Sequence, residues 1–130
     1  MYKSEITFAS KELTKRERVM LSDVSSATKF DEVIKGVDDT FAIEPVAYAL
    51  VSIENDKAKG ENQYEVIVIL DASGNKYVTG SQSFREAFVG IWEQMTDNGE
   101  IAAGEEFSIR VYKRPSKNYS GKAFISCALI

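Results

Sequence analysis

The chain contains no histidine and only one cysteine. Without histidine it lacks the commonest general base, the commonest metal ligand and any Ser/His or Cys/His nucleophile pair. A zinc site would have to consist almost entirely of carboxylates, which zinc proteins rarely use. The phosphate-binding patterns GxxxxGK[ST] and GxGxxG are also absent from the sequence. We therefore expect a protein that is not an enzyme and that carries neither a metal nor a cofactor.

Two further absences concern the compartment. No stretch approaches the roughly 18 apolar residues that a membrane span needs, and the first residues, MYKSEITFASKELTKRER, lack the apolar segment of a signal peptide. The single cysteine, Cys127, lies in the apolar run AFISCALI, so no intrachain disulfide can form. This composition predicts a cytoplasmic protein that is not associated with a membrane.

The length of 130 residues and the hydrophobic content of 44% predict one domain with a modest core. Residues 1–40 are predicted to form an N-terminal arm or accessory element. Within it, the charged segment KELTKRER (11–18) would form a helical turn capped by Ser10. From residue 41 onward short β-type runs dominate, so the core of the domain is predicted over residues 41–130.

The β-type runs are FAIE (41–44), VAYALVSI (46–53), YEVIVIL (64–70), KYVT (76–79), FSIRVYK (107–113) and AFISCALI (123–130). The turn formers DASGN (71–75) predict a hairpin between two of them. Apolar residues at three- and four-residue spacing predict one amphipathic helix at about residues 84–96, capped by Ser81 or Ser83. The sequence therefore predicts a mainly β fold, an OB-like five-stranded barrel plugged by that helix.

Positive charge is concentrated in the C-terminal segment, residues 107–130. It holds five of the 16 basic residues and none of the 20 acidic residues, although the chain has a net charge of −4. Strand alternation would place Ile109 and Val111 toward the core and Arg110 and Tyr112 toward solvent. A guanidinium can hold a phosphate, and an exposed ring can stack on a nucleobase. The predicted nucleic-acid-binding residues are Arg110, Tyr112, Lys113, Arg114, Lys117, Tyr119 and Lys122.

A purely structural role for the same segment remains open. Exposed tyrosines are common in strands because aromatic residues have high β propensity, and lysine on an edge strand protects against aggregation. Phe88 and Trp92 belong to the apolar face of the predicted helix, so we expect them in the core. Cys127 is likewise expected to be a small buried hydrophobic residue.

Three segments of the chain resemble small single-stranded DNA-binding proteins encoded by phages and mobile elements of Gram-positive bacteria. They are IEPVAYALVSIEN (43–55), YEVIVILDASGNKYVTGSQSFREAFVGIWEQM (64–95) and FSIRVYKRPSKNYSGKAFISCALI (107–130). The shared order is a strand, a hairpin with a D-x-x-G-type turn, a serine-capped helix and a strand ending in K-x-PSKN-x-x-GK-x-F. The resemblance extends from Ile43 onward, and the first 40 residues match less clearly.

The resemblance implies an OB-like fold that coats and protects single-stranded DNA, without sequence preference, during phage or mobile-element replication or recombination in the bacterial cytoplasm. Homo-oligomers and contacts with replication or recombination proteins are compatible with this role. The larger bacterial proteins of this function end in an acidic tail that recruits partners, whereas this chain ends in an apolar strand. The 20 acidic residues leave a second function open. The chain could be a small phage-type protein that imitates DNA and inhibits a host protein.

Overall fold

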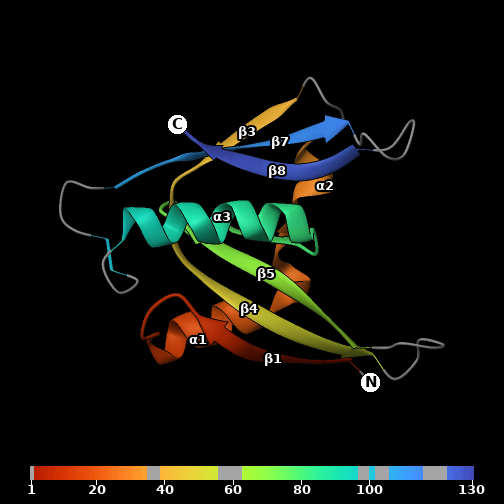
Figure 1. Ribbon diagram of the computed structural model, residues 1–130. Coiled ribbons are helices and arrows are strands. Elements are labelled where there is room, and N and C mark those ends of the chain that lie inside the picture. Colours follow the sequence, from red (N-terminus) through yellow and green to blue (C-terminus); the bar gives the residue numbers. More distant parts are fainter. Residues whose placement is uncertain (1, 35–38, 56–62, 97–99, 102–105, 116–122) are drawn as a thin grey trace.

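The computed structural model describes residues 2–34, 39–55, 63–96, 100–101, 106–115 and 123–130 (Figure 1). The helices and strands, in chain order, are β1 (Tyr2–Ala9), α1 (Lys15–Ser22), a 3-10 helix η1 (Val24–Ser26), β2 (Thr28–Lys29), α2 (Phe30–Val33), β3 (Thr40–Ile43), β4 (Pro45–Asn55), β5 (Gln63–Asp71), β6 (Lys76–Thr79), α3 (Gln82–Met95), β7 (Ile109–Pro115) and β8 (Ala123–Leu129). None of the helices in these ranges has the length and apolar character needed to cross a membrane.

The strands form two sheets. The large sheet has five strands in the order β1-β4-β5-β6-β2, in which only the short β2 runs parallel to its neighbour. The small sheet has three antiparallel strands in the order β3-β7-β8. The mainly β class is therefore confirmed, but the described strands do not close into a five-stranded barrel, and helices α1 and α2 accompany α3.

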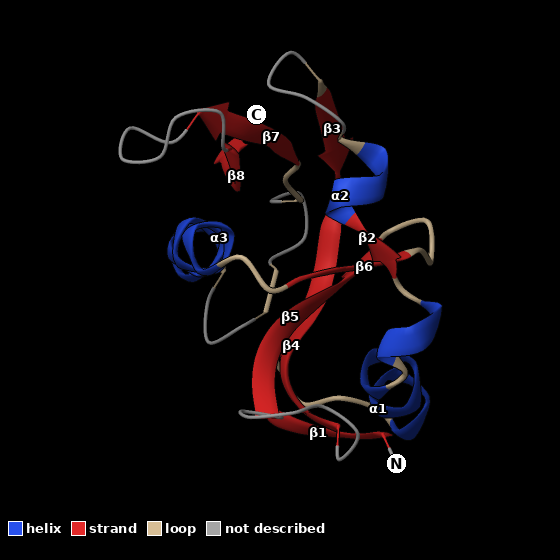
Figure 2. Cartoon of the chain, turned by 90° about the vertical axis from the view of Figure 1, so that its right-hand side faces the viewer, coloured by secondary structure: helices blue, strands red, loops and turns tan. Residues whose placement is uncertain are grey.

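Strand β5 lies at the centre of the large sheet and is buried on both of its faces. Every residue from Val66 to Leu70 is buried, because α3 packs on one face of the sheet and α1 on the other (Figure 2). A strand covered on both sides needs an uninterrupted apolar run rather than an alternating one. The sequence VIVIL meets this requirement.

The hairpin predicted between β5 and β6 is confirmed. Gly74 adopts a φ of 88°, a left-handed conformation that glycine enters without a Cβ clash. The Asp71 carboxylate accepts hydrogen bonds from the backbone N–H groups of Ser73 and Asn75 at 3.0 and 2.8 Å. These bonds fix the turn in the way that aspartate side chains commonly do.

The predicted amphipathic helix is α3, which begins two residues earlier than expected, at Gln82. Its N-cap is Ser81, whose hydroxyl accepts from the N–H of Phe84 at 3.3 Å and donates to the carbonyl of Ile125 in β8 at 3.1 Å. Its buried residues are Phe84, Phe88 and Trp92, so the expected core role of the last two is confirmed. The helix lies between the two sheets and contributes to a core that both share (Figures 1 and 2).

The prediction of a helical turn at residues 11–18 capped by Ser10 is wrong in position. Helix α1 begins at Lys15, and its N-cap is Thr14. The Thr14 hydroxyl accepts from the N–H of Glu17, and the Glu17 carboxylate accepts from the N–H of Thr14, which completes a capping box. Ser10 is instead buried, and its hydroxyl accepts from the backbone N–H of Tyr48 at 2.9 Å.

The N-terminal segment contributes to the large sheet. Strand β1 pairs with β4 in antiparallel fashion. Leu13 and Leu21 join a second buried cluster on the face of the large sheet opposite α3. Residues 2–22 therefore supply an edge strand and one covering layer of this sheet.

Candidate nucleic-acid interface

The small sheet has an inward face and an outward face, set by the alternation of side chains along β7. Ile109 and Val111 have no exposed surface and pack with α3 in the shared core. Arg110 and Arg114 are exposed and Tyr112 is half-buried. The predicted orientation of this strand is confirmed: its apolar pair points inward and its Arg–Tyr pair points outward.

Antiparallel partners point to the same side of a sheet, so the strand register defines the whole outward face. Thr40, Tyr112 and Ser126 form one row across it, Ala42, Arg110 and Ala128 form the next, and Arg114 lies opposite Phe124. Two cations, two aromatic rings and small side chains therefore share this face, and none of these eight residues is acidic. No described helix lies on the side of the small sheet turned away from α3 (Figures 1 and 2).

The two arginines of the outward face are available to a ligand. Within the described part of the chain, the side chains of Arg110 and Arg114 form neither a hydrogen bond nor an ion pair. Exposure without a partner leaves the full donor set of each guanidinium open to an anion.

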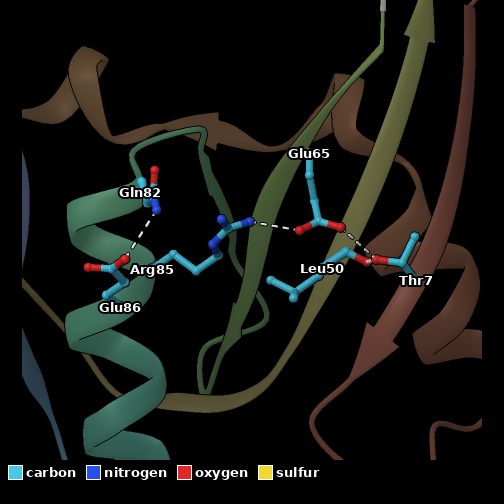
Figure 3. A network of polar contacts seen from close by, with 6 residues as sticks. All are labelled: Thr7, Leu50, Glu65, Gln82, Arg85 and Glu86. Carbon is cyan, nitrogen blue, oxygen red and sulfur yellow. Dashed lines mark hydrogen bonds and ion pairs between the residues drawn. The ribbon is translucent and has the colours of Figure 1, made fainter.

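Three basic residues near the large sheet, Lys11, Lys76 and Arg85, are engaged within the protein. Arg85 of α3 forms an ion pair with Glu65 of β5 at 2.7 Å, and the second oxygen of Glu65 accepts from the Thr7 hydroxyl of β1 at 2.9 Å (Figure 3). Lys11 pairs with Glu17 at 3.4 Å. The Nζ of Lys76 donates to two backbone carbonyls, those of Met20 at 2.6 Å and Asp23 at 3.0 Å.

The structure separates the predicted site residues into three groups. It brings Arg110, Tyr112 and Arg114 together on the outward face. Lys113 shares the inward side of β7 with Val111, faces Ile125 across the strand pair, and already has an interaction within the protein. It is not part of the outward face. Lys117, Tyr119 and Lys122 lie outside the described residues.

Sequence reasoning missed Phe124 as a surface aromatic. Its ring is half-buried, lies opposite Arg114 in β8 and is diagonal to Tyr112. The alternation of Ile125 and Cys127 toward the core could have indicated it, since Phe124 then takes the other side. Which residues lie beside Phe124 on the outward face, however, is decided by the register between β7 and β8, and the sequence pattern does not contain it.

Neither the single cysteine nor a described cluster of metal-ligand side chains contributes to the outward face. Burial raises the pKa of the Cys127 thiol to about 12, so this residue stays protonated at neutral pH and acts as the buried hydrophobic residue expected. Among the described residues, no three side chains of the His, Cys, Asp and Glu types lie together in an arrangement that could hold a metal ion. What the outward face can do is bind an anion and stack planar rings.

A scan against protein-family models, a search of curated proteins and a search of solved structures each found no match to this chain. Its function is therefore inferred from the sequence and from the geometry of the outward face.

Proposed function

We propose that the protein is a non-catalytic, sequence-tolerant single-stranded DNA-binding protein, and that the strand lies on the outward face of the small sheet. One observation carries this proposal. Arg110 and Arg114, two exposed arginines without partners among the described residues, share an acid-free sheet face with Tyr112 and Phe124. Proteins that bind single-stranded nucleic acid without sequence preference commonly combine cations that hold phosphates with aromatic rings that stack on bases.

The spacing along β7 suits alternate contacts to phosphates and bases. Arg110 and Arg114 are four residues apart, about 13 Å along an extended strand, so they would hold different phosphates. Tyr112 lies between them and would take the face of an intervening base, and Phe124 offers a second stacking surface. A duplex hides the faces of its bases, and the net charge of −4 repels it. Binding to duplex DNA should therefore be weak.

The passage from β3 to β4 supports an OB-like architecture. Only Glu44 separates these strands, yet β3 belongs to the small sheet and β4 to the large one. Strands that cross from one sheet to another in this way form the corners of small barrels. In the cell, the protein would coat DNA strands exposed during phage or mobile-element replication or recombination, in the cytoplasm of the bacterial host.

The test is a fluorescence anisotropy titration with labelled oligo(dT) at low salt. The double variant Arg110→Ala/Arg114→Ala should weaken binding at least roughly tenfold, because each charge-assisted contact to a phosphate is lost. The control is Arg18→Ala/Lys29→Ala, which removes the same charge from two exposed residues of α1 and β2. Equal losses in the two variants would refute a specific role of the outward face. No binding by the folded parent protein would refute the function itself and favour an inhibitor of a host protein.

A further inference from the structure

Helix α1 presents an exposed apolar side chain that lies beside positive charges. Val19 is 68% exposed and belongs to neither of the two core clusters. Lys15, one turn earlier, and Arg16 are also exposed, and their side chains form no hydrogen bond or ion pair with a described residue. Residues three and four apart on a helix are surface neighbours. We call Lys15, Arg16 and Val19 the α1 knob.

Helix α3 has a recess on its exposed side. A Cβ at Gly90 would meet nothing within 4 Å apart from its own stretch of helix, so packing within the described part of the chain does not require a glycine there. Glycine is the poorest helix former apart from proline. Glu86, one turn before Gly90, and Glu93, one turn after it, are both exposed. We call Glu86, Gly90 and Glu93 the α3 notch.

The charge of the α3 notch is not neutralised by described residues. Glu93 forms no hydrogen bond or ion pair with them. Glu86 accepts one hydrogen bond, from the neutral amide of Gln82 at 3.1 Å (Figure 3). Arg85 is the one cation within α3, and it is paired with Glu65. The exposed side of α3 is therefore negative.

The α1 knob and the α3 notch are complementary in shape and in charge. One is a protruding apolar side chain beside cations, and the other is a recess between two carboxylates. A glycine on the surface of a helix allows a second helix to approach closely, because interaxial distance depends on the side chains at the contact. With Val19 over Gly90, Lys15 comes beside Glu86 or Glu93, whichever way the docked helix runs.

The two surfaces belong to different sides of the molecule. Helices α1 and α3 cover opposite faces of the large sheet, so the knob and the notch of one copy cannot meet (Figure 2). For the same reason, one partner cannot occupy both surfaces of a copy. A contact of this kind joins different surfaces of successive copies and continues in a row. Neither surface lies on the outward face of the small sheet, which stays open to DNA.

We propose that copies of the protein associate head to tail, with the α1 knob of one copy docked on the α3 notch of the next. Helix α1 has only eight residues, so the contact is small and association of the free protein is weak. Copies bound side by side on one DNA strand are at a high effective concentration, and docking then makes coating cooperative. The role in coating rests on the proposed function, whereas the self-association does not.

Sedimentation velocity of the DNA-free protein at low salt tests the contact. The average sedimentation coefficient of the parent should rise with concentration without levelling off at a dimer. Gly90→Gln fills the notch and should weaken association at least roughly tenfold. It should not lower the midpoint of thermal unfolding, because the new side chain has open space and glutamine favours helix.

The matched control is Ser83→Gln, which adds the same side chain to another exposed position of α3, two turns earlier. It should associate like the parent. Association of Gly90→Gln at the strength of the parent protein would overturn the proposal.

Charge reversal identifies the second copy as the partner. Lys15→Glu/Arg16→Glu makes the knob acidic, and Glu86→Lys/Glu93→Lys makes the notch basic, so each double variant alone should stay monomeric. An equimolar mixture should associate, because the reversed knob meets the reversed notch and the native knob meets the native notch. A mixture of folded variants that stays monomeric, at concentrations where the parent associates, would contradict the proposal.

Binding to DNA of two lengths separates this proposal from the proposed function. On oligo(dT) long enough for several copies, the parent should bind cooperatively and Gly90→Gln should not, while both bind a one-copy oligo(dT) equally. If oligo(dT) binds through Arg110 and Arg114 but the parent neither self-associates nor binds the long strand cooperatively, the docking is wrong and the function stands. If the parent associates through the knob and the notch but binds no oligo(dT), the docking stands and the function is wrong.

Discussion

On strand β7 the inward residues Ile109 and Val111 have no exposed surface, whereas the outward residues Arg110 and Arg114 are exposed and unpaired among the described residues. Neighbouring positions of one strand thus differ in what they contribute. The inward positions join the small sheet to α3, and the outward positions present charge to solvent. We infer that stability and DNA binding are separated by the alternation of this strand, so substitutions at successive residues should affect one property or the other.

The largest effect is expected at the inward face. Ile109→Ala should lower the free energy of unfolding by about 2–5 kcal/mol, because it opens a cavity in the core shared by the small sheet and α3. Denaturant unfolding measures this loss. The protein that remains folded should bind oligo(dT) with unchanged affinity. A large loss of affinity in the folded fraction would show that the two faces are not independent.

The next effect is expected at the outward rings. Tyr112→Ala and Phe124→Ala should each weaken oligo(dT) binding by about 1–3 kcal/mol, the contribution of one stacked base. Tyr64→Ala serves as the control, since it removes an exposed tyrosine from the large sheet. Anisotropy titrations of the three variants measure the difference. If Phe124→Ala binds like the parent protein, the outward face ends at β7.

A smaller change should appear in the salt dependence of binding. Each phosphate contact on a single strand contributes about −0.7 to the slope of log affinity against log salt. Arg110→Ala/Arg114→Ala should therefore make the slope shallower by about 1.4. Titrations at several salt concentrations give this slope for the parent and the variant. An unchanged slope would mean that neither arginine touches the DNA backbone.

The smallest effect is expected for a cation that is already paired. Arg85→Ala should leave oligo(dT) affinity almost unchanged, because Glu65 holds this guanidinium at 2.7 Å. Its cost in unfolding free energy should be about 0–1 kcal/mol, as for other partly exposed ion pairs. Glu65→Gln provides the complementary variant for the same measurements. Arg85→Ala could instead weaken oligo(dT) binding as much as Arg110→Ala. In that case an ion pair within the protein would not distinguish structural cations from those that bind DNA.

Features with strong local patterns were predictable from the sequence. Strands β4 to β6, the turn around Gly74 and helix α3 follow from apolar periodicity and turn formers over short windows. The faces of β7 follow from the alternation of Ile109 to Tyr112. Charge alone groups Lys113 with Arg110 and Arg114, whereas the alternation along the strand places it on the inward side.

Other features depend on contacts that short sequence windows do not contain. Strand β1 and helix α1 carry many charged residues, and the few buried ones, such as Leu13 and Leu21, become core residues only against β4 and β5. The pairing of Phe124 with Arg114 depends on the register between β7 and β8. Residues 116–122 connect these strands, and a connection of this length does not determine the register through its turn type. The predicted roles of Lys117, Tyr119 and Lys122 in that connection stay predictions.

The central claim, that single-stranded DNA lies on the outward face of the small sheet, can be tested most directly by NMR. The protein would be labelled with ¹⁵N, and the Nε–Hε signals of the arginines and the backbone amides would be followed as oligo(dT) is added. The account predicts large shifts for the side chains of Arg110 and Arg114 and for the amides of β7 and β8, with little change at Arg85. Shifts that leave Arg110 and Arg114 unchanged while oligo(dT) is bound would contradict it.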